Sequence, residues 1–192
     1  MAWLILGLVL FLGPHSVRIF ADGWRSASID RIGAPAWKGL YTVVSILGLV
    51  LVIHGYGVAR TDPALLWNPP AWGRHATALL TLVSFILVAA AYIPGTRIRE
   101  KIGHPMLAGT KLWALGHLLS NGTLADLVLF GAFLVWAIAQ FRVSRRRDRA
   151  EGRTRPAAAG WTRDAAAVGT GIVATGIFAM WLHIPLIGVR PF

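Results

Sequence analysis

Histidine is the residue type in this sequence with the widest scope for chemistry. The chain has no cysteine, which excludes thiolate catalysis, disulfides and cysteine-based metal sites. Neutral imidazole is the commonest metal ligand in proteins, and two histidines that face each other across a helical bundle are a natural axial pair for haem iron. The six histidines are His15, His54, His75, His104, His117 and His183.

His15 and His104 form the stronger candidate pair. His15 follows Pro14, which frees backbone groups nearby, and His104 precedes Pro105, which suits the first turn of a helix. Both are expected near the same membrane face, so we predict them as the axial ligands of one haem b. Cations near them can pair with haem propionates, and one tryptophan can stack on the cofactor. These predicted cofactor-binding residues are Arg18, Arg97, Arg99, Lys101, Lys111 and Trp113.

The other histidines are expected near the opposite face, and they leave an alternative open. A lone interfacial histidine is most often hydrogen-bonded to a neighbour, and cations near lipid often act only as topology signals. The set of His54, His75, His117 and His183 nevertheless remains an alternative site for a metal or a second haem.

Membrane helices must position these side chains. Apolar residues make up 56% of the 192 residues and charged residues 14%, against about 25% in an average soluble domain. A soluble core of this size cannot hide so much apolar surface. We therefore predict one all-α domain over residues 1–192, a polytopic membrane helix bundle of about six transmembrane helices. The predicted spans are 2–20, 39–58, 76–93, 105–119, 123–141 and 165–189, and the fourth is expected to be shielded from lipid because it is short and carries Lys111 and His117.

The positive charges indicate how the bundle is oriented. The net charge of +11 can suggest nucleic acid, but in a membrane protein Lys and Arg collect on the cytoplasmic side, so we predict a lipid bilayer and no nucleic acid as the partner. The loops after the first, third and fifth spans hold most cations, including an Arg-rich loop over 142–163. The opposite loops hold only Arg60, Arg74 and Arg190. The Arg-rich side is therefore predicted to be cytoplasmic.

Two smaller features concern the helices themselves. Asp126 is the only acid inside a predicted span, and its place shortly after Thr123 predicts a role in capping the fifth helix. Small residues in the last span, Gly169, Gly171 and Gly176, predict close helix packing in lipid.

Two motifs carry a resemblance to a known family. Gly-Pro-His-Ser at 13–16 and the block over 103–122 resemble the NnrU family of bacterial membrane proteins, and the likeness covers essentially the whole chain. That family is similar to the plant zeta-carotene isomerase, a haem b enzyme in which two histidines ligate the haem; by motif they correspond to His15 and His104. The resemblance implies a multi-pass protein of the bacterial inner (plasma) membrane, linked to nitrite and nitric oxide metabolism. It also implies haem-dependent cis-trans isomerisation of a hydrophobic small molecule as an activity.

A second resemblance involves the segment 103–109. It is similar to the Arg-His-Pro-x-Tyr-x-Gly motif of membrane methyltransferases that use S-adenosylmethionine, but Gly103 and Leu107 replace the Arg and the Tyr. Their paired glutamates near the C-terminus are also missing here. Three functions stay open: a haem-binding protein with redox, nitric-oxide-sensing or isomerase activity, a membrane methyltransferase, and a non-catalytic membrane component of denitrification.

Overall fold

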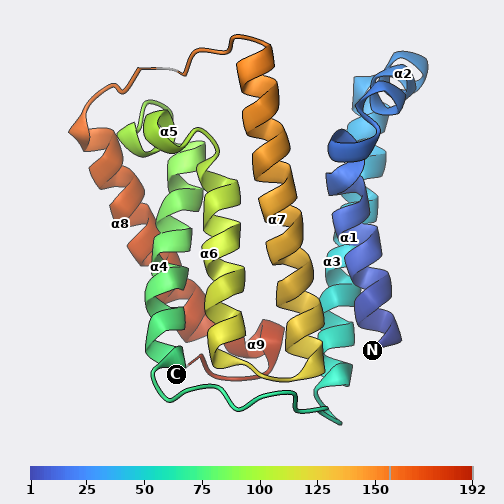
Figure 1. Cartoon of the computed structure of the whole chain (residues 1–192), viewed down its shortest axis with the longest axis vertical. Coiled ribbons are helices and arrows are strands. Elements are labelled where there is room, and N and C mark those ends of the chain that lie inside the picture. Colours follow the sequence, from blue (N-terminus) through green and yellow to red (C-terminus); the bar gives the residue numbers. More distant parts are fainter. Residues whose placement is uncertain (156, 192) are drawn as a thin grey trace.

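The protein is a bundle of helices (Figure 1). The computed structural model describes residues 1–155 and 157–191, and every regular element in that part is helical. Five helices are long and apolar enough to cross a membrane. The predicted all-α membrane bundle is therefore confirmed. Its elements are α1 (Ala2–Phe20), α2 (Asp22–Ile32), α3 (Ala34–Ala59), α4 (Gly73–Tyr92), α5 (Arg97–Ile102), α6 (Pro105–Ser120), α7 (Leu124–Ala150), α8 (Trp161–Ile177), the π-helix η1 (Phe178–Leu182) and α9 (His183–Ile187).

The surface of the bundle is suited to lipid. Only 11% to 28% of the residues in the five apolar stretches are buried inside the chain. On α3, for example, Val43, Ile46 and Val50 are each more than half exposed. Exposed apolar surface of this extent is unfavourable in water, and hydrocarbon is the solvent that accepts it. Helices satisfy their own backbone hydrogen bonds, so they tolerate that solvent.

The helices form two groups joined by α7 (Figure 1). In one group α1 packs along α3, and in the other α4 packs against both α6 and α8. Helix α7 contacts α6 on one side and α1 on the other. Helix α6 has 16 residues and lies between α4 and α7. It corresponds to the predicted fourth span, and its neighbours shield it from lipid as expected.

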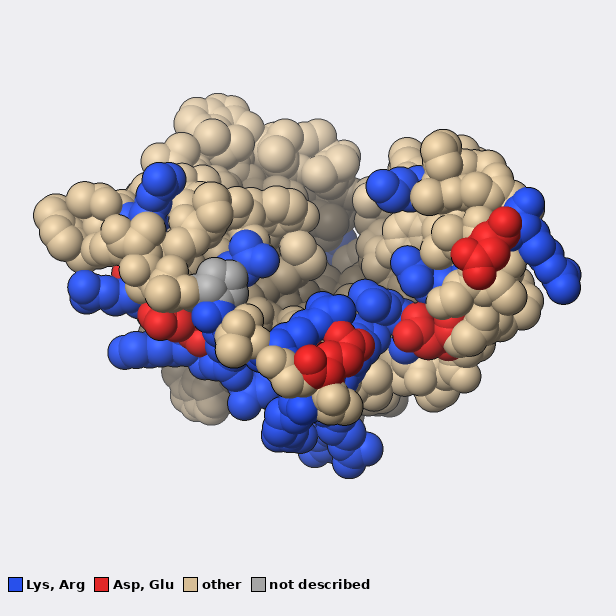
Figure 2. Space-filling model, turned by 90° about the horizontal axis from the view of Figure 1, so that it is seen from above, with Lys and Arg blue, Asp and Glu red and all other residues tan. Residues whose placement is uncertain are grey.

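One end of the bundle, here called the basic face, collects the positive charge (Figure 2). Successive long helices run up and down, so α2, α5, the end of α7 and the start of α8 meet there (Figure 1). The predicted Arg-rich loop over 142–163 is wrong at both ends, because α7 continues to Ala150 and α8 already begins at Trp161. Arginine is a good helix former, and the glycine that ends this run comes only at Gly152. Only residues 151–160 connect the two helices.

The alternation of helices predicts where each connection lies relative to the membrane. Reporter fusions at Arg147 and at Asn121 are expected to report opposite sides, with Arg147 cytoplasmic, because one position lies on the basic face and the other at the far end of α7. Alkaline phosphatase and fluorescent-protein fusions measure this directly. The same side for both reporters would mean that α7 does not cross the bilayer.

Candidate functional site: two cavities at opposite faces

The larger cavity lies at the end of the bundle opposite the basic face, and we call it the distal cavity. It has a volume of about 800 Å³ and lies among the ends of α3, α4, α6 and α7 and the C-terminal segment. Its lining combines aromatic, polar and charged side chains. The lining includes Trp113, Phe85, Phe130, Phe133 and Phe178, the cations Arg60, Arg74 and Arg190, and the histidines His117 and His183.

Both histidines of the distal cavity leave Nε2 free to bind a metal. Nδ1 of His117 lies 2.8 Å from the carbonyl oxygen of Trp113, and Nδ1 of His183 lies 2.7 Å from that of Val189. A carbonyl oxygen only accepts, so each Nδ1 donates the ring proton. The Nε2 of each neutral ring then keeps a free lone pair. Metal-binding histidines are commonly oriented in this way by a backbone carbonyl.

The surroundings hold each imidazole in place. The His117 ring stacks on Phe130 at a centroid distance of 4.6 Å, and it also contacts Trp113 at 5.1 Å. His183 meets Phe178 edge to face at 5.8 Å. It also directly follows the π-helix η1, and π-helical turns occur frequently at functional sites. Both rings therefore have a defined orientation before any ligand is present.

A polar link beside the distal cavity ties three segments together. Tyr56 on α3 donates to Oδ1 of Asp126 on α7 at 2.6 Å, and this bond is buried. The other carboxylate oxygen closes a capping box with Thr123, which confirms the predicted capping role of Asp126. Arg60 lies over the Tyr56 ring and donates to the carbonyl oxygen of Ile187 at 2.9 Å. This chain of contacts positions the C-terminal segment at the cavity.

The Tyr56 hydroxyl is expected to contribute measurably to stability. Tyr56→Phe should lower the free energy of unfolding by about 1 to 2 kcal/mol, because it leaves a buried carboxylate oxygen without its donor. Tyr92→Phe is the matched control, since Tyr92 is 73% exposed. Denaturation of the full chain in mixed micelles measures both. Equal losses in the two variants would contradict a structural role for this bond.

The predicted inner pair is not brought to one cavity. His15 lies on a second cavity of about 590 Å³ at the basic face, here called the basal cavity. Its Nδ1 donates to the carbonyl oxygen of Phe11 at 2.6 Å. His104 is absent from the described lining of that cavity, and its Nε2 lies 2.8 Å from Oδ2 of Asp148. His15 thus has a free Nε2 and His104 does not, so joint ligation by this pair stays a prediction.

The family described as NnrU protein matches residues 3–191. The chain belongs to the NnrU family. No curated protein and no solved structure matches it. Both cavities and both sequence motifs lie within the NnrU match.

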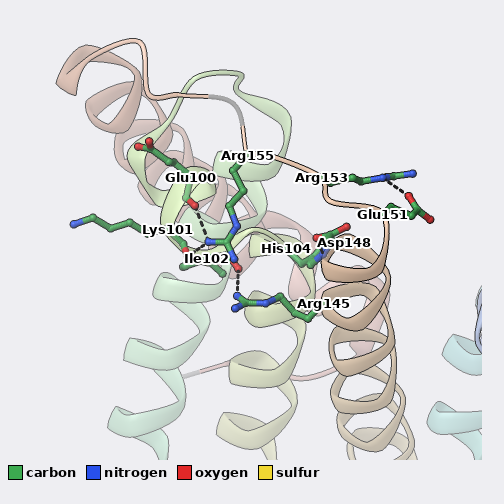
Figure 3. Close-up of polar contacts among 9 residues, drawn as sticks. All are labelled: Glu100, Lys101, Ile102, His104, Arg145, Asp148, Glu151, Arg153 and Arg155. Atoms are coloured by element: carbon green, nitrogen blue, oxygen red, sulfur yellow. Dashed lines mark hydrogen bonds and ion pairs between the residues drawn. The ribbon is translucent and has the colours of Figure 1, made fainter.

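Most of the predicted cofactor-binding cations of this NnrU chain lie away from both cavities. Arg155 donates to the carbonyl oxygens of Glu100 and Lys101, and Arg145 to that of Ile102 (Figure 3). These contacts fasten the turn before α6 to α7 and to the connection that follows it. Lys111 lies over the Phe141 ring at 3.7 Å. Among the predicted cofactor-binding residues, Arg18 lines the basal cavity and Trp113 the distal one, whereas the described linings of both cavities omit Arg97, Arg99, Lys101 and Lys111.

From sequence, His117 and His183 belong to the alternative metal or haem site of this NnrU chain, behind His15 and His104. Their predicted depth was the available signal, because it placed His117 and His183 near the same face. Within residues 1–155 and 157–191, no group of three or more His, Cys, Asp or Glu side chains is placed to hold a metal ion. A haem iron needs at most two protein ligands, because the porphyrin supplies four nitrogens. Two histidines on one cavity therefore fit a haem better than a bare ion.

Proposed function

We propose that the chain is a membrane haem b protein and that Nε2 of His117 and Nε2 of His183 are the axial ligands. One observation carries the proposal: two imidazoles from separate helices line one cavity, each with Nδ1 bonded to a backbone carbonyl and Nε2 free. An axial pair requires two histidines from separate helices at one site. The distal cavity supplies two, whereas the described lining of the basal cavity contains only His15.

The remaining lining of the distal cavity suits a porphyrin. Its volume of about 800 Å³ falls within the range of small-molecule and cofactor sites. Several aromatic side chains line the cavity, and flat conjugated rings stack well on them. Arg74 and Arg190 add positive charge to the same cavity and can pair with two propionates. The chain has no cysteine, so attachment would be non-covalent, as in a b-type site.

The bound group would supply one-electron redox chemistry, which two axial histidines favour. The protein itself would bind this group and orient the two histidine ligands. The carbonyl of Trp113 and the ring of Phe130 would hold His117 in its orientation. We therefore favour electron transfer in the bacterial plasma membrane, in support of nitrogen-oxide metabolism. An isomerase activity would require one histidine to leave, and His183 is the candidate because it sits on the short C-terminal helix α9.

Spectroscopy of the purified protein tests the proposal. The full chain, expressed with adequate haem supply, is expected to show a Soret band, low-spin visible bands on reduction and about one haem per chain by pyridine haemochrome assay. Well-folded protein without haem would overturn the proposal. A colourless preparation that binds S-adenosylmethionine would favour the methyltransferase alternative instead.

A further inference from the structure

The basal cavity has features that the haem proposal does not use. It lies between α1, α2 and α3 on one side and α6 and α7 on the other, with a volume of about 590 Å³. Figure 2 shows a hollow at this place, between the part formed by α1 to α3 and the rest of the molecule. The cavity lies toward the basic face, because Arg25 and Ile29 of α2 and Lys38 near the start of α3 line it.

Three cations from three different helices line the basal cavity. They are Arg18 on α1, Arg25 on α2 and Lys38 on α3. The acid beside them is Asp22, whose Oδ1 lies 3.6 Å from Nε of Arg18 and 3.9 Å from Nη1 of Arg25. One carboxylate cannot neutralise three cations. The cavity therefore keeps an excess of positive charge and favours an anion.

Buried polar atoms at this cavity also lack partners. Nε1 of Trp136 and Oε1 of Gln140 are buried, and neither has a hydrogen-bond partner among the described residues. Nε of Arg18 is also buried and makes no hydrogen bond with the described residues, although it is ion-paired with Asp22. All three residues line the basal cavity. Burial of unpaired polar groups costs free energy, and native proteins usually satisfy them. A ligand with acceptor oxygens would satisfy the two donors, and a hydroxyl on the same ligand would satisfy Gln140.

We propose that the basal cavity binds the headgroup of an anionic phospholipid with a hydroxylated headgroup, such as phosphatidylglycerol. Its phosphate supplies the charge and the acceptor oxygens. Apolar side chains stand beside the cations, among them Ile29, Met106 and Leu107, and they offer the acyl chains a path into the bilayer. The cytoplasmic leaflet, which the basic face indicates, is where anionic lipids attract such clusters. Inorganic phosphate has the same charged group but no apolar part.

Lipid retention by matched variants tests this proposal. The full-length protein is reconstituted in nanodiscs of phosphatidylglycerol and phosphatidylcholine, transferred to mild detergent and analysed by native mass spectrometry for lipid that stays bound. Arg25→Gln should reduce retained phosphatidylglycerol about five-fold. Arg31→Gln makes the same charge change on α2 at an exposed position outside the described lining, and it should leave retention nearly unchanged.

A second variant keeps the cavity shape. Trp136→Phe retains an aromatic wall and removes the Nε1–H donor, so retention should again fall, by about five-fold. If Arg25→Gln fails to fold, lipid retention by Trp136→Phe tests the proposed lipid site on its own. Equal losses for Arg25→Gln and Arg31→Gln, or equal retention of phosphatidylcholine, would overturn the proposal. Displacement of the lipid by inorganic phosphate, with phosphate then bound in its place, would assign the site to a free anion and overturn it as well.

Discussion

Replacing His117 or His183 with alanine is expected to abolish the low-spin haem spectrum of the purified protein. Each variant loses one of the two proposed axial ligands, both of which line the distal cavity. Loss of a supporting group around a metal ligand already weakens binding by about 10-fold to 100-fold, so loss of the ligand itself should reduce haem occupancy by more than about ten-fold. Any haem that remains should be high-spin, because one coordination position is then open. Absorption spectra and haem content per chain measure both effects.

Two pairs of control histidines make this experiment decisive. His54 and His75 lie near the same end of the bundle, are exposed and do not occur in the described lining of the distal cavity, so their alanine variants should keep the wild-type spectrum. His15→Ala and His104→Ala test the pair predicted from sequence. If these two variants lose the low-spin spectrum while His117→Ala and His183→Ala keep it, the basal pair holds the haem and the distal assignment is wrong.

Replacing Gly55 with alanine is expected to destabilise the protein through a clash between α1 and α3. A Cβ atom at Gly55 would overlap the backbone nitrogen of Leu4, and backbone cannot move aside as a flexible side chain can. Overpacking of this kind typically costs about 1 to 3 kcal/mol. The matched control is Gly57→Ala, two residues further along α3, where an added Cβ meets nothing within 4 Å. Alanine is the better helix former, so this control should be neutral or stabilising by up to about 1 kcal/mol.

The unfolding free energy of the full chain in mixed micelles, measured for both variants, separates a packing effect from a general effect of alanine. Equal shifts would show that α1 and α3 do not approach each other as closely as the structure has them. The result also bears on the cavities. Helices α1 and α3 carry His15 and Tyr41 to the basal cavity, and α3 carries Tyr56 to the distal one.

Glycine also shows where sequence reasoning reached its limit. Small residues in an apolar span predict a close helix contact, but they do not say which of them makes it. Of the three predicted glycines, only Gly171 lies against another helix, where a Cβ atom would meet the backbone of Ile86. Gly169 faces open space. Close approaches of two helix backbones also occur at Gly7, Gly48 and Gly55, because these positions lie along the contact between α1 and α3.

For the histidines too, the sequence indicates which residues could act but not which contacts they make. Depth along each helix follows from the ends of the apolar stretches, and it groups His15 with His104. It places His117 and His183 in one group with His54 and His75, so it does not single them out as a pair. In His15, His117 and His183 a backbone carbonyl four to six residues away engages Nδ1. The partner of His104 is instead 44 residues away in the sequence. Asp148 falls in the predicted Arg-rich loop, and only the continuation of α7 to Ala150 brings it to Nε2 of His104.

The sequence by itself determined that this chain is an all-α membrane protein, roughly where its helices run and which end carries the positive charge. Those properties are sums over neighbouring residues: apolar length sets a span, and Lys and Arg counts distinguish the faces. Only the tertiary structure decided how the helices pair and rotate, and hence that His117 and His183 share a cavity. A helix in lipid is apolar on most sides, so its sequence carries little periodic signal for the face that packs. Contacts with other helices set that face.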